Sequence, residues 1–294
     1  ELIKENDKVV AMEADLGGAS KFTNIKKSNP ENFIQCGISE ANMIGVGCGL
    51  SSEGFIPYVH TFGPFATRRV YDQIYLSGAY AHNTINIYGS DPGFTVGPNG
   101  GTHTTWEDVA LMREIPGSII VDPCDETQTR WVVKELSKHE GVHYIRANRK
   151  DVRNVYTPDS TFELGKGNVL REGKDILIIV SGQLVSDALD CAEKLVEEGY
   201  SVEVIDMYCI KPLDIDLVLS ESKGKKAVVT FENHSIYGGL GSAVAEVLME
   251  NGVNVPFKRH GVDERFGQVG TPDFLQKEFQ LTADDLYRTI KSMI

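Results

Sequence analysis

The sequence predicts an α/β protein made of two doubly wound domains, each with a mostly parallel sheet covered by helices on both faces. Two observations support this fold class. Short apolar runs typical of buried strands alternate with amphipathic segments of helical periodicity along the 294-residue chain. One polar stretch, residues 148–175, interrupts that alternation. We therefore expect a first domain over residues 1–155, a linker over 156–169 and a second domain over 170–294.

The individual elements follow from the same periodicity, taken in chain order. In the first domain, strands are expected at 8–15, 33–39, 56–62, 84–91, 118–124 and 142–148, and helices at 40–52, 66–81, 106–115 and 126–139. In the second domain, strands are expected at 175–182, 201–208 and 226–233, and helices at 185–199 and 241–251.

The stretch FIQCGISEANMIGVGCGLSS, residues 33–52, combines a carboxylate with an unusual glycine content. It is typical of a buried strand followed by a helix, with Ser39 as the N-cap and Glu40 in the first turn. An acid in that turn gains about 0.3–1 kcal/mol from the helix dipole and needs no function. Gly45, Gly47 and Gly49, however, each cost about 1 kcal/mol relative to alanine. We expect a helix or a ligand to pack closely against this segment.

The amino-acid composition and the net charge argue against some classes of binding partner and some cellular locations. The formal net charge of −13 argues against a nucleic acid or an anionic membrane as the main partner. No apolar run approaches the roughly 20 residues of a membrane span, and no signal peptide is visible, so we expect a cytoplasmic protein. The five cysteines are an odd number without CxxC spacing, which favours reduced core residues over disulfides or zinc ligands: Cys36, Cys48, Cys124, Cys191 and Cys209.

Polar and glycine-rich segments follow most of the predicted strands. In parallel sheets ligands bind beyond the carboxyl ends of the strands, so these segments are the expected carriers of chemistry. They are DLGGAS (15–20), ISEAN (38–42), HTFGPF (60–65), SDPGFTVGPNGGTHT (90–104), DPCDE (122–126) and ANRKD (147–151).

Several of these segments agree with one family. The motifs GISEANM, HTFGPFATRRVYDQI and GFTVGPNGGTHTTWEDVALMR resemble the pyrimidine-binding domain of transketolases, and FENHSIYGGLGSAVAEVL resembles the transketolase C-terminal domain. The resemblance covers nearly the whole chain, in the expected order. It is closest to the C-terminal subunit of a split transketolase, in which two polypeptides share what is usually one chain. It implies a thiamine-diphosphate pyrimidine-binding domain followed by the C-terminal domain.

The resemblance also implies an activity and a set of cofactor contacts. The expected reaction transfers a two-carbon ketol unit from a ketose, either a phosphate or another anionic sugar such as a sulfosugar, to an aldose phosphate. Glu40 matches the acid that hydrogen-bonds the pyrimidine N1′ of thiamine diphosphate and promotes loss of the cofactor's C2 proton. Phe62 and Phe65 match aromatic residues of the pyrimidine pocket, although two phenylalanines three apart are usually core. Asp15 lies in the matching Ala-Asp-Leu motif on the cofactor side.

Other matched positions belong to the substrate. By resemblance, His103 contacts the carbonyl or C1 hydroxyl region of the donor and helps to move protons. Arg149 matches an arginine that holds the distal phosphate, although an arginine after a strand is by default a solvated charge. Ser20 is expected to assist it, with Ala19 as the competing match. Arg69 and Asp72 either brace the loop near Phe65 or form an ordinary surface pair.

The sequence departs from the family in one loop. Asp91 stands where a histidine is usual, Pro98 and Asn99 replace a Glu-Asp pair, and Thr104 replaces a glutamine. The aspartate replaced by Asn99 normally recognises donor hydroxyl stereochemistry. These changes affect the substrate side, so they bear on the identity of the donor more than on the reaction type.

A second departure concerns the metal. The family binds diphosphate and a divalent metal through a Gly-Asp-Gly motif, and no such motif occurs in this sequence. We therefore expect Mg²⁺ or Ca²⁺ to be bound by an N-terminal partner subunit that carries the motif, in an α2β2 heterotetramer.

Three alternatives stay open at this point. The β subunit of a 2-oxo-acid dehydrogenase has the same domain order but transfers an acyl group to a lipoyl group. Deoxyxylulose-phosphate synthase normally carries its cofactor domain on the same chain. A non-catalytic assembly subunit would only complete the fold of a partner.

Overall fold

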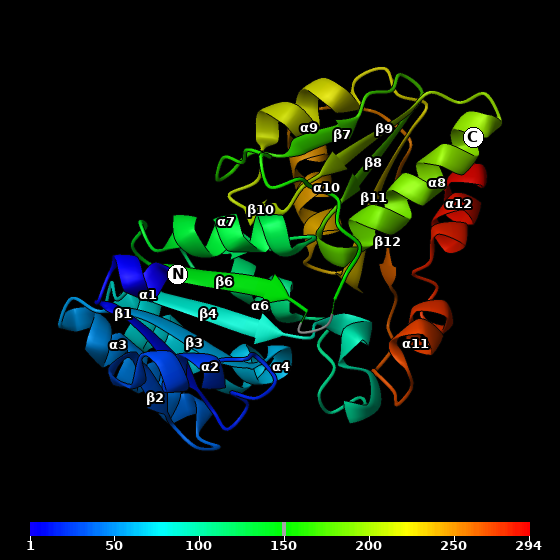
Figure 1. Cartoon of the computed structure of the whole chain (residues 1–294). Helices are drawn as coiled ribbons and strands as arrows, with labels where there is room; N and C mark the ends of the chain where they lie inside the picture. Colours follow the sequence, from blue (N-terminus) through cyan, green and yellow to red (C-terminus); the bar gives the residue numbers. More distant parts are fainter. Residues whose placement is uncertain (149–150) are drawn as a thin grey trace.

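The computed structural model describes residues 1–148 and 151–294, and it contains two sheets (Figure 1). The larger has seven strands in the order β10 (Cys209–Lys211), β5 (Ile119–Val121), β6 (Val142–Ala147), β4 (Ile85–Ser90), β3 (Ile56–Phe62), β1 (Val9–Glu13) and β2 (Phe33–Gln35). All neighbouring pairs are parallel except β10–β5. The predicted α/β class is confirmed.

The helices of the first half cover this sheet and form many of its connections. They are α1 (Leu2–Glu5), α2 (Thr23–Ser28), α3 (Glu40–Ser52), α4 (Gly63–Ala66), α5 (Tyr71–Gln73), α6 (Asp108–Arg113) and α7 (Glu126–Leu136), with short 3₁₀ or π segments η1 (Pro30–Asn32), η2 (Arg68–Val70), η3 (Ile74–Tyr80) and η4 (Gly93–Asn99). The prediction of a single helix over 66–81 is wrong. Thr67 leaves the helical region, so α4 ends at Ala66, and Val70 leaves it again before α5, which continues directly into the π segment η3.

The second half forms a five-stranded sheet in the order β12 (Phe257–Val262), β11 (Ala227–Ser235), β8 (Ile176–Val180), β9 (Val202–Asp206) and β7 (Asn168–Arg171), of which only β7 is antiparallel. Its helical segments are η5 (Gly182–Leu184), α8 (Val185–Glu197), α9 (Ile215–Ser222), α10 (Leu240–Glu250), α11 (Pro272–Glu278) and α12 (Ala283–Lys291). The sequence analysis missed the two edge strands, β7 and β12. Their half-exposed, partly polar residues lack the apolar run of a buried strand.

The two halves are joined by more than the linker. Strand β10 comes from the second half of the chain but pairs with β5, with Cys209 opposite Val121, and lies between the two lobes (Figure 1). One apolar cluster is continuous across the boundary, since it includes Met112 and Ile115 together with Met207 and Leu240. No helix in the described part of the chain is long and apolar enough to cross a bilayer.

The region around α3 differs from its prediction in the length and burial of β2 and in the cap hydrogen bond, and it agrees with the prediction at Gly47. Strand β2 has only three residues and lies half-exposed at the sheet edge, where β1 alone pairs with it. Ser39 occupies the N-cap position, but its side chain forms no capping hydrogen bond within the described residues. Close packing is seen only at Gly47, where an added Cβ would lie 3.2 Å from Ile85 Cδ1. Gly45 and Gly49 face open space instead.

Candidate functional site

The strand ends of the first sheet place the predicted site loops at one edge. Register pairs Glu13 with His60, Phe62 with Ser90, and Ser90 with Ala147, so β1, β3, β4 and β6 present their carboxyl ends on the same side. The loops that follow these strands therefore leave the sheet together, as the sequence predicts.

Glu40 is the first residue of α3 and is almost fully buried, with 6% of its surface exposed. Its Oε1 accepts a charge-assisted hydrogen bond from Arg69 Nη1 at 2.6 Å. The side chain of Arg69 itself is 45% exposed, so the pair lies where the protein interior meets the surface. A buried carboxylate held by a single, partly solvated cation is well placed to contact a ligand at that boundary.

Aromatic rings extend the site from Arg69 to His103. The guanidinium carbon of Arg69 lies 3.6 Å from the centroid of the Phe65 ring, a cation–π contact. The His103 ring packs edge-on against Phe65 at 5.0 Å and against Phe62 at 5.5 Å between centroids. Four residues that the sequence predicts at the site thus lie in one connected cluster: Glu40, Phe62, Phe65 and His103. Arg69 links Glu40 to the three rings, because it contacts both Glu40 and Phe65.

His103 is held with one ring nitrogen engaged. Thr102 Oγ1 lies 2.9 Å from its Nδ1, and the carbonyl of Thr102 accepts from Arg68 Nη2 at 3.3 Å. Partial burial, and secondly the positive charge of Arg69, lower the pKa of the imidazole below its usual value. The neutral form, which can accept a proton, is therefore favoured near neutral pH.

The loop after β4, in which the sequence departs from the family pattern, has several residues with positive φ. Asp91, immediately after β4, is fully buried with a left-handed backbone (φ 54°). Gly97 and Gly100 also have positive φ, and Thr104 Oγ1 donates to the carbonyl of Gly100 at 3.1 Å. Asn99 lies exposed at the far end of η4. The two substituted positions, 91 and 99, thus lie at opposite ends of one turn segment, position 91 at its buried end and position 99 at its exposed end.

Asp15 and Ser20 lie in the loop after β1. Asp15 is exposed, has a φ of 59°, and its N–H donates to Gln35 Oε1 at 3.2 Å. Ser20 Oγ accepts from the N–H of Phe22 at 3.2 Å. The contacts seen in residues 1–148 and 151–294 do not join either side chain to the cluster around Glu40, so their roles stay predictions. Arg149 lies outside the described residues.

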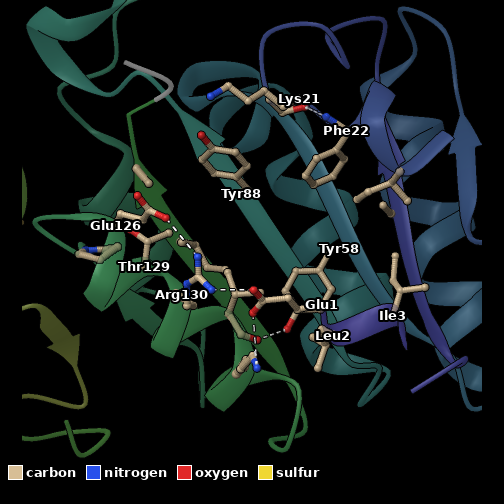
Figure 2. A pocket seen from close by; sticks show the side chains of 18 of the residues that line it. Glu1, Leu2, Ile3, Lys21, Phe22, Tyr58, Tyr88, Glu126, Thr129 and Arg130 are labelled. Carbon is tan, nitrogen blue, oxygen red and sulfur yellow. Dashed lines mark hydrogen bonds and ion pairs between the residues drawn. The ribbon is translucent and has the colours of Figure 1, made fainter. Parts of the chain in front are cut away.

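Ser20 lines a cavity of about 830 Å³ between α7 and the loop after β1. Figure 2 shows Tyr58 and Tyr88 pointing into it from the sheet, with Phe22 beside them and Arg130 of α7 opposite.

The side chains at the Glu40 cluster fit part of thiamine diphosphate. Flat aromatic and imidazole rings beside a buried carboxylate suit a nitrogen heterocycle that stacks and shares a proton. No group of three or more His, Cys, Asp or Glu side chains in the described residues is arranged to hold a metal ion. The cluster therefore fits the pyrimidine half of the cofactor.

Sequence reasoning underestimated Arg68 and Arg69. The spacing of Arg69 and Asp72 predicts a loop brace or an ordinary surface pair, whereas Arg69 is the partner of Glu40. Arg68 was not singled out, yet it connects the segment after β3 to the loop of His103 through Thr102 and also pairs with Glu107. The available signal was two consecutive arginines directly after the aromatic motif.

Comparison with known proteins yields consistent matches over almost the whole chain. Residues 1–155 match the family model described as transketolase, pyrimidine binding domain, and residues 165–286 match transketolase, C-terminal domain. The 6-deoxy-6-sulfo-D-fructose transketolase subunit SqwH of Clostridium sp. (strain MSTE9) is 44% identical over 98% of this chain and 89% of its own length. A putative transketolase C-terminal section of Methanocaldococcus jannaschii is 38% identical over 99% of this chain and 92% of its own.

Among solved structures, one described as a split gene transketolase, inactive beta4 tetramer, superimposes with a TM-score of 0.92 at 40% identity. That match covers 99% of this chain and 94% of the other.

Proposed function

Because this chain belongs to the transketolase family, we propose that it is the C-terminal subunit of a thiamine-diphosphate-dependent transketolase that moves a two-carbon ketol unit from a ketose to an aldose phosphate. The observation that carries this proposal is the continuous cluster from the Glu40 carboxylate through Arg69 and Phe65 to His103. It combines an acid, flat rings and a neutral imidazole at one sheet edge.

When bound, thiamine diphosphate supplies the nucleophilic carbon on which cleavage and formation of the sugar carbon–carbon bond depend. Glu40 would hold a nitrogen of the pyrimidine ring through a shared proton, at a carboxyl whose burial excludes bulk water. Arg69 holds that carboxyl in place through Oε1. Phe62 and Phe65 would pack against the ring and exclude water from it.

His103 moves the proton of a sugar hydroxyl. Thr102 Oγ1 engages Nδ1, which leaves Nε2 to accept that proton and return it. The lowered pKa of His103 keeps the imidazole neutral before the sugar binds. Asp91 and Asn99 select among donors by their hydroxyl groups, the exposed Asn99 by contact and the buried Asp91 through the shape of the loop. Arg149 and Ser20 hold the distal anionic group.

The diphosphate and its metal are held by a partner subunit in an α2β2 assembly. An exposed apolar face supports a neighbouring subunit, because α3 and η3 lie against each other and expose Val46, Tyr75, Leu76 and Tyr80. Gly45 and Gly49 lie on α3 with open space above them, so another backbone is free to approach closely there.

A sulfosugar is the donor we favour. The 44% identical relative is named for 6-deoxy-6-sulfo-D-fructose, and a sulfonate presents the same kind of oxyanion to an arginine fork as a phosphate does.

The test is a donor screen on the complex reconstituted with its N-terminal subunit, thiamine diphosphate and Mg²⁺. Donors are 6-deoxy-6-sulfofructose, fructose 6-phosphate and xylulose 5-phosphate, with an aldose phosphate as acceptor. We expect ketol transfer whose turnover Glu40→Gln lowers by about 10²–10⁴. Acyl transfer from a 2-oxo acid to a lipoyl domain, without ketol transfer, would contradict the proposal. Full ketol transfer with the Glu40→Gln variant would show that this chain only completes its partner's fold.

A further inference from the structure

Asn233, near the end of β11 in the second domain, reaches into the first domain and is 3% exposed. Its Nδ2 donates to the carbonyl of Pro92 at 3.0 Å, and its Oδ1 accepts from the N–H of Phe94 at 3.3 Å. One carboxamide therefore closes the first turn of the loop that begins at Asp91. A Cβ added to the intervening Gly93 would lie 2.0 Å from Asn233 Oδ1, so the turn is packed directly on this amide.

A buried ion network fixes the backbone of Asn233. Its carbonyl accepts from Arg146 Nη2 at 2.7 Å. The same guanidinium donates to Asp108 Oδ2 at 2.7 Å and to Asp122 Oδ2 at 3.1 Å, and all three charged side chains are nearly inaccessible to solvent. Because Arg146 belongs to β6 of the first sheet, the position of Asn233 is tied to the sheet whose edge carries the site.

The far end of the same loop is also shaped by the second domain. A Cβ added to Gly101 would lie 2.3 Å from the carbonyl oxygen of Gly267, and one added to Gly267 would lie 2.3 Å from Thr104 Oγ1. Both ends of residues 92–104 are thus in contact with residues of the second domain, on either side of Asn99 and His103.

We propose that Asn233 is a positioning residue through which the second domain sets donor selectivity. Its amide fixes the turn at residues 92–94, next to the buried Asp91, and so determines where the exposed end of the loop, with Asn99 and His103, meets the donor hydroxyls. This inference rests on the proposed ketol transfer. It adds a role for a residue of the C-terminal domain that does not itself touch the reacting atoms.

The test compares Asn233→Ala and Asn233→Asp with a matched control, Glu246→Ala. Glu246 forms another contact between the domains, an ion pair with Arg113 that involves no residue of the loop. Asn233→Asp keeps the acceptor for the Phe94 N–H but loses the donor to Pro92. In the reconstituted complex, kcat/KM is measured for 6-deoxy-6-sulfofructose and xylulose 5-phosphate, together with the Kd of thiamine diphosphate.

We expect Asn233→Ala to change the ratio of the two kcat/KM values by about tenfold, with Asn233→Asp intermediate, because a buried turn loses its amide partners. The cofactor Kd should stay within about twofold, and Glu246→Ala should leave the ratio unchanged. NMR of the isolated chain supplies a readout independent of activity, since Asn233→Ala should shift the His103 ring signals.

Equal losses for both donors, or unchanged His103 signals, would overturn the inference. If Asn233→Ala does not fold, Asn233→Asp tests the inference in the same assays, because it preserves the side-chain volume. An unchanged ratio of the two kcat/KM values in Asn233→Asp would then overturn the inference. A wild-type complex that shows no ketol transfer would refute the proposed function itself. In that case the role of Asn233 in donor selectivity would be refuted too, whether or not the His103 signals shift.

Discussion

The carboxylate of Glu40 and the guanidinium of Arg69 form an ion pair 2.6 Å long, although 29 residues separate them in the chain. The same guanidinium stacks on Phe65, which also touches His103. A single arginine therefore contacts the acid of the site and influences its base.

Glu40→Gln preserves the shape of the side chain but cannot share an acidic proton. We expect turnover to fall by about 10²–10⁴, the range for lost acid–base catalysis, with folding retained. Steady-state kinetics of the reconstituted complex and thermal unfolding measure the two effects. Glu126→Gln is the matched control, since Glu126 is an exposed first-turn acid of α7. Near-normal turnover with Glu40→Gln would leave only the helix-dipole role.

Arg69→Met should raise the pKa of His103 toward its ordinary value, because a neighbouring positive charge that disfavours the imidazolium is removed. The rise should be partial, since burial is the larger cause of the lowered pKa and remains. His103 is titrated by NMR in the isolated chain, with His103→Asn for assignment. Arg68→Met is the control, as Arg68 bonds Thr102 and Glu107 instead.

The same substitution has a kinetic consequence. If a neutral His103 accepts a proton, the acidic limb of the kcat–pH profile should move to higher pH in Arg69→Met and stay in place in Arg68→Met. An unmoved limb together with a shifted NMR titration would remove His103 from the proton-transfer step.

The isolated chain should not bind thiamine diphosphate and Mg²⁺ tightly, because no metal-binding group is found in its described residues and no Gly-Asp-Gly motif in its sequence. Calorimetry on the chain alone should show weak or no binding. With the N-terminal subunit present, binding should become tight and metal-dependent, in an assembly of α2β2 mass. Tight metal-dependent binding to the chain alone would contradict the split site.

Arg149→Ala should lower kcat/KM by roughly 10- to 150-fold, mostly through KM, since a charge-assisted hydrogen bond to the distal anionic group contributes about 1.5–3 kcal/mol. Arg153→Ala is a suitable control because Arg153 pairs with Asp190 at the exposed surface. Equal effects of the two substitutions would indicate general electrostatic attraction and no specific contact.

Restoring the usual family residues, Asp91→His together with Asn99→Asp, should shift preference toward ordinary ketose phosphates and leave cofactor affinity unchanged. The reason is that both positions belong to one loop, while Glu40 and Phe65 belong to other elements. The ratio of kcat/KM for two donors measures the shift. A wild type that already prefers xylulose 5-phosphate, with no change in the double variant, would show that the loop does not select donors.

Much of the fold was predictable from local patterns. Buried parallel strands such as Ile176–Val180 are continuous apolar runs, and amphipathic helices such as α8 repeat every three to four residues. The edge strands β2, β7 and β12 were mispredicted or missed, because a strand with one neighbour and one solvated side carries a weaker pattern. The sequence predicts one helix over 66–81, because apolar residues recur there at helical spacing, and that spacing does not reveal the break at Thr67.

The sequence by itself determined the fold class, the order of the two domains and the chemical types gathered at the sheet edge, since alternating periodicity and motif spacing are local properties. The tertiary structure alone decided that Arg69 pairs with Glu40, that β10 crosses to the first sheet, and that Asn233 reaches the loop after Asp91. Asn233 and the turn at Pro92 are 141 residues apart in the chain. Contacts of that kind depend on how whole sheets pack against each other, and no local spacing encodes them.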